Sequence, residues 1–301
     1  MQYHLNRLRS AQRLVLTVAI SALAALGLTV GTTKPALAEF EIQESEVEQG
    51  EIELEYRGAV HTGFPKAERE EAEEDDDDEG ALEEEEEGEF LRQSHDFEIQ
   101  YGISNRLLFS TTFGTDEPLD SNYALSSIEI EFQYEIIERK GDGLGLAFAS
   151  GYGIAYRNEE ADELEFGPIV ELASGKFLLT TNTFFSSQVG DHRETDGLGF
   201  EYGWRAQYNF AKKWGVGAEM FGEIEDLSNA GSFNDQAHSL GPTLFYMPGG
   251  DDDDDDNGND DNNHKVAGPP EMELSLNVGV QFGLTDVTSD AAVKFQGSLG
   301  F

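Results

Sequence analysis

The sequence predicts an all-β fold: a closed antiparallel transmembrane β-barrel of about twelve strands that follows a cleaved N-terminal signal peptide. Three observations predict it. Long segments alternate apolar and polar residues with a period of two, the spacing of a strand with unlike faces. Short connections alternate with long ones along the chain. The last predicted strand ends at the C-terminal residue, Phe301, which resembles the signal that outer-membrane barrels present to their assembly machinery.

The composition excludes several classes of function. The 301 residues contain 61 acidic and 19 basic side chains, which gives a formal net charge of −42. This charge excludes nucleic-acid binding through phosphate neutralisation. The chain has no cysteine, which excludes disulfides, thiolate metal sites and cysteine nucleophiles. The mean hydropathy of −0.47 excludes a helical membrane protein but not a membrane barrel, because alternating strands average out.

Residues 1–38 have the three-part form of a secretory signal peptide. Three arginines precede an apolar run from Leu14 to about Val30, and Ala36-Leu37-Ala38 then forms a cleavage signal. A single membrane-spanning helix is the alternative, which the short, alanine-rich run disfavours. After this signal peptide we expect a periplasmic segment at 39–50 and the barrel at 51–301.

The alternation is clear in the segment 124–137, where Ile128, Ile130 and Phe132 alternate with acidic and amide residues. Helical spacing does not fit such segments. A transmembrane strand needs roughly 9–11 residues at a tilt of about 45°, and most of these segments reach that length. The predicted strands are 51–62, 90–102, 107–114, 124–137, 144–157, 164–172, 177–187, 198–210, 214–225, 238–248, 271–284 and 291–301.

Short turns on one side and long loops on the other are typical of bacterial outer-membrane barrels, with the short turns in the periplasm. An even strand count puts both chain ends on that side. Two acidic stretches, 63–89 and 249–270, are too highly charged to bury apolar area, so we expect disordered loops. The second falls on the periplasmic side. Either it is a periplasmic insertion, or the count before it is wrong by one strand.

A secreted β-sandwich with one wet face is the soluble alternative, but it does not need twelve long strands. In hydrocarbon an unpaired backbone polar group costs several kcal/mol, so a spanning sheet must close on itself. The apolar residues would then face lipid. The alternating glycine, alanine, glutamate and amide residues would line a wet or filled interior.

Three stretches resemble the outer-membrane β-barrel family named after the meta-pathway of phenol degradation. They are Tyr101-Gly102-Ile103-Ser104-Asn105-Arg106-Leu107, Gly241-Pro242-Thr243-Leu244, and Phe282 to Asp290 with Lys294 and Phe301. The resemblance covers 50–301 apart from the two acidic stretches. It implies a twelve-stranded barrel with a transporter or porin-like role and no agreed substrate.

Part of the second acidic stretch matches the first half of a calcium-binding loop. Asp253, Asp255, Asn257 and Asp261 occupy ligand positions, but His264 stands where a bidentate glutamate is needed. These residues are therefore weak calcium or magnesium candidates, and loose binding of divalent cations by both stretches is the simpler expectation.

Charged residues on the polar side of the alternation are candidates for lining a pore. Inward arginines and lysine would pair with Glu129, Glu131, Glu201 or Glu273, either as a structural plug or as a selectivity filter. The pore-lining candidates are Arg92, Glu129, Glu131, Glu201, Arg205, Glu273 and Lys294.

We therefore expect an outer-membrane channel or transporter for small solutes, passive and cation-preferring, with membrane lipid, the assembly machinery and divalent cations as partners. The alternatives are a non-conducting surface barrel whose acidic loops bind ions or a partner, and a barrel enzyme of the lipase or deacylase type. No serine–histidine pair has an informative spacing, so we expect no catalytic residues, no enzyme activity and no cofactor. The solute, the openness of the lumen and the oligomeric state stay open.

Overall fold

The structure is a computed structural model of the whole chain, and six stretches of it are described. The described residues are 40–63, 91–118, 122–156, 160–193, 195–248 and 272–301. The expected signal peptide lies outside them, as do nearly all of the two acidic stretches and the four calcium or magnesium candidates.

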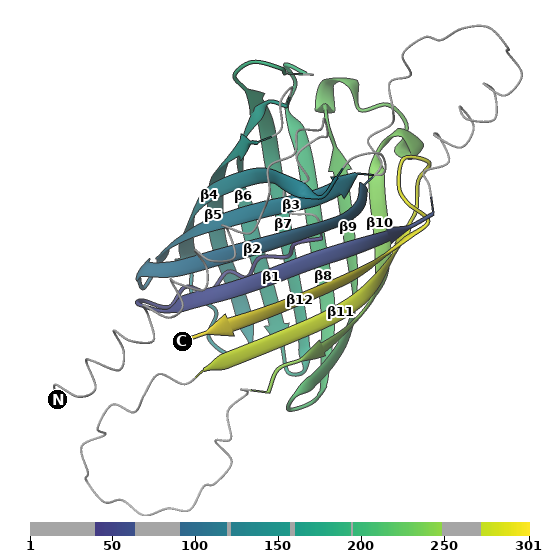
Figure 1. Cartoon of the computed structure of the whole chain (residues 1–301). Coiled ribbons are helices and arrows are strands. Elements are labelled where there is room, and N and C mark those ends of the chain that lie inside the picture. Colours follow the sequence, from purple (N-terminus) through teal and green to yellow (C-terminus); the bar gives the residue numbers. More distant parts are fainter. Residues whose placement is uncertain (1–39, 64–90, 119–121, 157–159, 194, 249–271) are drawn as a thin grey trace, which may run out of the picture.

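Twelve antiparallel strands form one closed barrel, as predicted (Figure 1). Each strand pairs with its sequence neighbours, and β1 also pairs with β12. The observed ends differ from the predicted ones by at most four residues. The strands are β1 (Ile52–Thr62), β2 (Leu91–Ser104), β3 (Leu107–Pro118), β4 (Ala124–Ile137), β5 (Gly143–Ala155), β6 (Asp162–Ser174), β7 (Phe177–Val189), β8 (Gly199–Ala211), β9 (Trp214–Ile224), β10 (Ala237–Tyr246), β11 (Glu273–Gly283) and β12 (Ala291–Gly300).

The barrel closes where the first and last strands meet. β1 pairs with β12 in continuous register from Glu53 opposite Gly300 to Thr62 opposite Ala291. Beyond this ladder, the Ile52 amide donates to the Phe301 carbonyl at 3.0 Å, and the Phe301 amide donates back at 3.1 Å. The terminal residue thus helps to close the sheet and leaves no open edge to face hydrocarbon.

The outer face of the barrel is apolar. Side chains such as Phe132, Tyr134 and Val278 are 47–50% exposed although they belong to regular strands. Exposed apolar side chains in such numbers indicate a surface that faces lipid. Near the tight turns, Trp214 packs against Tyr246 with ring centroids 4.6 Å apart, as expected for an interfacial aromatic girdle.

The two ends of the barrel differ. We call the end with the tight turns β2–β3, β4–β5, β6–β7 and β8–β9 the turn end, and the opposite one the loop end. β10 ends and β11 begins at the turn end, where the Met247 amide donates to the Lys213 carbonyl. The predicted number of strands before the second acidic stretch was therefore right. No helix in the described residues is long and apolar enough to cross a membrane.

The inner face is polar, and the length of its side chains differs from strand to strand. The inward residues of β5 are only glycine and alanine, from Gly143 to Ala155. Its neighbours β4 and β6 carry long inward side chains, among them Glu131 and Glu171. The small residues of β5 leave room in the lumen that other parts of the chain fill.

Residues 40–50, which we call the inner segment, fill part of that room. They were expected to lie in the periplasm before the barrel, but they run inside it. Phe40 stacks on His61 towards the loop end, and the Gly50 amide donates to the Gly102 carbonyl at the turn end. The chain then turns into β1. The expectation was wrong because nothing local reveals that the segment contacts inward side chains of distant strands.

Candidate functional site

The barrel holds the inner segment through its backbone. The Gln43 amide donates to Asn182 Oδ1 at 2.7 Å, and Asn182 Nδ2 donates to the Gln43 carbonyl at 3.0 Å. Gln133 donates to the Glu44 carbonyl at 3.0 Å, and Lys294 donates to the Phe40 carbonyl at 3.3 Å. Side chains from β4, β7 and β12 thus satisfy backbone groups that a buried extended segment would otherwise leave unpaired.

The acidic side chains of the inner segment face inward cations of the barrel, one after another. Glu41 lies 3.0 Å from Arg57, and Glu44 lies 3.4 Å from Arg205. Glu46 lies 3.6 Å from Arg139, in the β4–β5 turn. Acidic side chains of the inner segment thus pair with basic side chains of the barrel at three points along the lumen. The inner segment and these barrel cations thus form one network of ion pairs inside the lumen.

Glu219 on β9 is the centre of a second buried group. Lys294 Nζ lies 2.6 Å from its Oε2, and Arg205 Nε lies 2.8 Å from its Oε1. Thr243 donates to Oε2 at 2.7 Å. Both carboxylate oxygens are thus satisfied although Glu219 is fully buried. A buried charge removed from water needs such partners.

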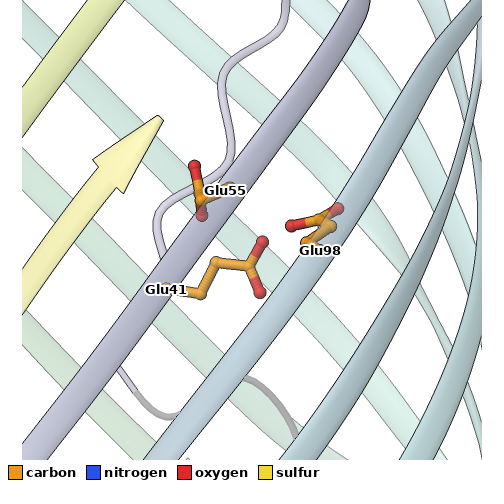
Figure 2. A group of neighbouring side chains, drawn as sticks. All are labelled: Glu41, Glu55 and Glu98. Carbon is orange, nitrogen blue, oxygen red and sulfur yellow. The ribbon is translucent and has the colours of Figure 1, made fainter. Parts of the chain in front are cut away.

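Three carboxylates meet around one guanidinium nitrogen of Arg57. Glu41 comes from the inner segment, and Glu55 and Glu98 come from β1 and β2, all pointing toward one another (Figure 2). Their oxygens lie 3.0, 2.6 and 2.7 Å from Arg57 Nη1. The spacing would suit a metal ion, but the positive charge at its centre comes from Arg57 itself.

A cavity of about 320 Å³ lies beside the inner segment, in the loop-end half of the lumen. Phe40 and Gln43 form part of its lining, and β4, β6 and β8 contribute Glu129, Glu165 and Glu201. Its volume lies at the lower end of the usual range for small-molecule sites. We call this cavity the vestibule.

The predicted pore residues fall into three groups. Glu129 and Glu201 line the vestibule, whereas Glu131 accepts a hydrogen bond from Gln43 at 3.1 Å. Arg205 and Lys294 point inward as expected, but they pair with Glu219 instead of the partners that we predicted.

The other two candidates lie at the rims. Arg92 is half exposed at the loop end and pairs with Glu117 at 3.3 Å. Glu273 is exposed at the turn end. The predicted partners were wrong because strand alternation gives the face of a residue but not its neighbours around the barrel.

Sequence reasoning missed two central residues, Glu171 and Glu219. Glu171 accepts a hydrogen bond from Ser45 Oγ at 2.5 Å. Each is an acid on the inward face of its strand, and that position follows from the alternation. That signal was present in the sequence and could have identified both residues.

The structure also brings together a serine and a histidine. His61 Nδ1 lies 3.0 Å from Ser289 Oγ in the wall of the vestibule. They are 228 residues apart in sequence, so spacing gave no sign of the pair.

Comparisons with known proteins give the following results. No family model matches the sequence, and no curated protein matches it. Among solved structures, an outer membrane channel from Pseudomonas putida F1 is 9% identical with a TM-score of 0.48, covering 87% of this chain and 100% of that one. The NanC porin is 8% identical with a TM-score of 0.45, covering 82% of this chain and 98% of that one. The KdgM porin is 8% identical with a TM-score of 0.44, covering 83% and 98%.

The architecture itself gives the location. A closed barrel with an apolar outer face, a polar lumen and short turns at one end spans a bilayer with every strand edge paired. Single-chain barrels of this kind with an even number of strands are those of the bacterial outer membrane. The chain is an outer-membrane β-barrel.

Proposed function

We propose that the protein is a passive outer-membrane channel for small solutes with a preference for cations. The observation that carries the proposal is the vestibule, a cavity of about 320 Å³ inside the closed barrel with Glu129, Glu165 and Glu201 in its wall. A cavity lined by one sign of charge between low-dielectric walls concentrates ions of the opposite sign.

The inner segment sets the width of the passage. Its carboxylates Glu41, Glu44 and Glu46 are paired with arginines of the barrel, so the segment adds little net field. The Glu44 and Glu46 side chains remain 58% and 52% exposed, which supports a water-filled space beside the segment. Small ions and solutes would pass through that space, and larger ones would be excluded.

Liposome swelling tests this proposal. Proteoliposomes that hold the purified protein are placed in isotonic solutions of a small amine salt, a small carboxylate salt or an uncharged sugar. The channel predicts fast swelling with the amine and slower swelling with the carboxylate of equal size. Swelling no faster than in protein-free liposomes would support the alternative, a non-conducting barrel whose acidic loops bind ions or a partner.

A barrel enzyme is a second candidate because of the contact between His61 and Ser289. A serine hydrolase needs a histidine base within hydrogen-bond reach of the serine, and these two residues meet that condition. We propose that the pair is structural and that the protein is not an enzyme. Hydrolysis of short and long acyl esters that is lost in Ser289→Ala and retained in Ser187→Ala would overturn this.

We also propose membership of the barrel family named after the meta-pathway of phenol degradation. Its support is local. Tyr101–Leu107 spans the β2–β3 turn, Gly241–Leu244 lies on β10, and Phe282–Asp290 leads through the β11–β12 loop. Growth on aromatic acids of a strain that lacks the gene would show whether the resemblance extends to transport. Unchanged growth would leave only the resemblance of these motifs.

A further inference from the structure

The vestibule has an uncompensated acidic wall. Glu129, Glu165 and Glu201 form no ion pair with a lysine or arginine of the described chain. The buried cations Arg57, Arg205 and Lys294 each already contact other carboxylates. The loop-end half of the lumen is therefore a region of unbalanced negative charge.

A second observation points to a ligand in the same cavity. Gln281 on β11 lines the vestibule and is 1% exposed, and neither of its amide atoms has a hydrogen-bond partner within the described chain. Leaving a buried polar group unpaired costs about 1–3 kcal/mol, so such groups usually have a partner. A cationic ligand that donates hydrogen bonds would satisfy the side-chain carbonyl oxygen of Gln281.

The spacing of the carboxylates excludes one metal ion held by all three of them. Among the described residues, only Glu41, Glu55 and Glu98 bring three ligand atoms within 4.8 Å of one another. The three vestibule carboxylates are therefore too widely spaced to coordinate one ion together. A longer cation with charges at separate points can reach them.

The lumen also shows what kind of cation its carboxylates accept. Arg57 and Lys294 present nitrogen cations to carboxylates at 2.6–3.0 Å. Lys294 Nζ also lies 5.0 Å from the centre of the Phe221 ring, which lines the vestibule together with Phe40. Rings of this kind attract cations and pack against methylene groups.

We infer that the vestibule is a binding site for an elongated organic cation with two or more amino groups, that is, an aliphatic polyamine. Its ammonium groups bind to Glu129, Glu165 and Glu201, its methylenes pack on Phe40 and Phe221, and an amino group donates to the Gln281 carbonyl. The inference assigns a substrate class to the proposed channel. Transport of the polyamine rests on that proposed function, but binding of the polyamine does not.

Binding is measured on the full chain in detergent at about 0.15 M salt, with spermidine as the probe, by isothermal titration calorimetry. The triple variant Glu129→Gln, Glu165→Gln, Glu201→Gln is compared with Glu53→Gln, Glu135→Gln, Glu273→Gln, which removes the same charge from the turn-end half of the same lumen. Both retain the acidic stretches, so any binding there is common to the two. The inference predicts one spermidine site with at least tenfold weaker affinity in the vestibule variant and unchanged affinity in the turn-end variant.

A second measurement needs no variant. Carboxyl groups of the wild-type protein are labelled with a carbodiimide and glycinamide, with and without spermidine, and the sites are mapped by mass spectrometry. The inference predicts protection of Glu129, Glu165 and Glu201 but not of Glu273. Equal protection at all four, equal losses in the two triple variants, or calcium that displaces spermidine at equal concentration would overturn it. None of these readouts depends on conduction, so a protein that binds spermidine without swelling liposomes would refute the channel and not this site.

Discussion

The side-chain amide of Asn182 on β7 forms two hydrogen bonds with the backbone of Gln43 in the inner segment. Its oxygen accepts from the Gln43 amide, and its nitrogen donates to the Gln43 carbonyl. Asn182 is 2% exposed, so water does not compete for these bonds. Asn182 is thus one of the side chains that hold the inner segment inside the barrel.

Asn182→Ala should loosen the inner segment. Two hydrogen bonds at about 0.5–1.5 kcal/mol each imply that local opening becomes easier by about 1–3 kcal/mol. Amide hydrogen exchange of residues 40–48, followed by mass spectrometry, should then be roughly 5- to 150-fold faster. Thr180→Val is the matched control, because Thr180 lies two positions away on the same face and its hydroxyl has no partner within the described residues. Equal exchange rates in the two variants would contradict the anchoring role.

The position of the inner segment can be trapped with a disulfide. A side chain added at Gly145 would meet the Ser45 hydroxyl, so Ser45→Cys with Gly145→Cys should place two thiols within bonding distance. The natural chain has no cysteine, so this pair is unambiguous. Mild oxidation should remove both free thiols as counted with a maleimide reagent. Ser45→Cys with Ser186→Cys, whose second position lies near the loop end, should keep both. The same result for both pairs would mean that the segment does not lie as described.

Glu219→Gln should strongly destabilise the barrel. Removing one partner of a buried ion pair costs about 3–5 kcal/mol, and here Lys294 loses its carboxylate while Arg205 keeps only its contact with Glu44. The urea midpoint of the folded protein in detergent should fall accordingly. Glu273→Gln, at the exposed rim, should change the free energy of unfolding by less than about 0.5 kcal/mol. Adding Lys294→Met to Glu219→Gln should restore part of the loss. A midpoint unchanged by Glu219→Gln would show that the cluster contributes nothing to stability.

The stability of the loop that contains Asp226, at the loop end, should decrease only at low pH. The Asp226 carboxylate accepts hydrogen bonds from the Ser228 hydroxyl at 2.6 Å, from Thr195 Oγ1 at 2.7 Å and from the Ser228 amide at 2.7 Å, and these bonds lower its pKa. An aspartate with a lowered pKa stabilises the fold above its unfolded pKa of about 3.9, and this stability is lost as the pH falls through the lower folded value.

Limited proteolysis around residues 226–229 should therefore be constant from pH 7 to about pH 5 and increase only below about pH 4. Asp226→Asn, which cannot ionise, should remove this dependence on pH. An increase in cleavage already near pH 6 would contradict the assignment to Asp226.

The strands could be predicted from sequence because they depend on local alternation. Ile128 to Tyr134 alternate so regularly that both the strand and its inward face follow from it. The inner segment could not be predicted, because Glu41, Glu44 and Glu46 find their cations 16 to 161 positions away. Likewise, the alternation showed that Arg205 and Lys294 point inward. Only closure of the barrel showed that both reach Glu219, since β9 and β12 are not neighbours.

The zero-current potential of the protein in a planar lipid bilayer tests the central claim most directly. With a tenfold potassium chloride gradient at pH 7, the acidic vestibule predicts discrete openings whose reversal potential shifts toward the potassium equilibrium potential. The shift should decrease when Glu129, Glu165 and Glu201 are replaced by glutamine. Openings that reverse at the chloride potential, or a bilayer that stays silent with folded protein inserted, would contradict a cation-preferring channel.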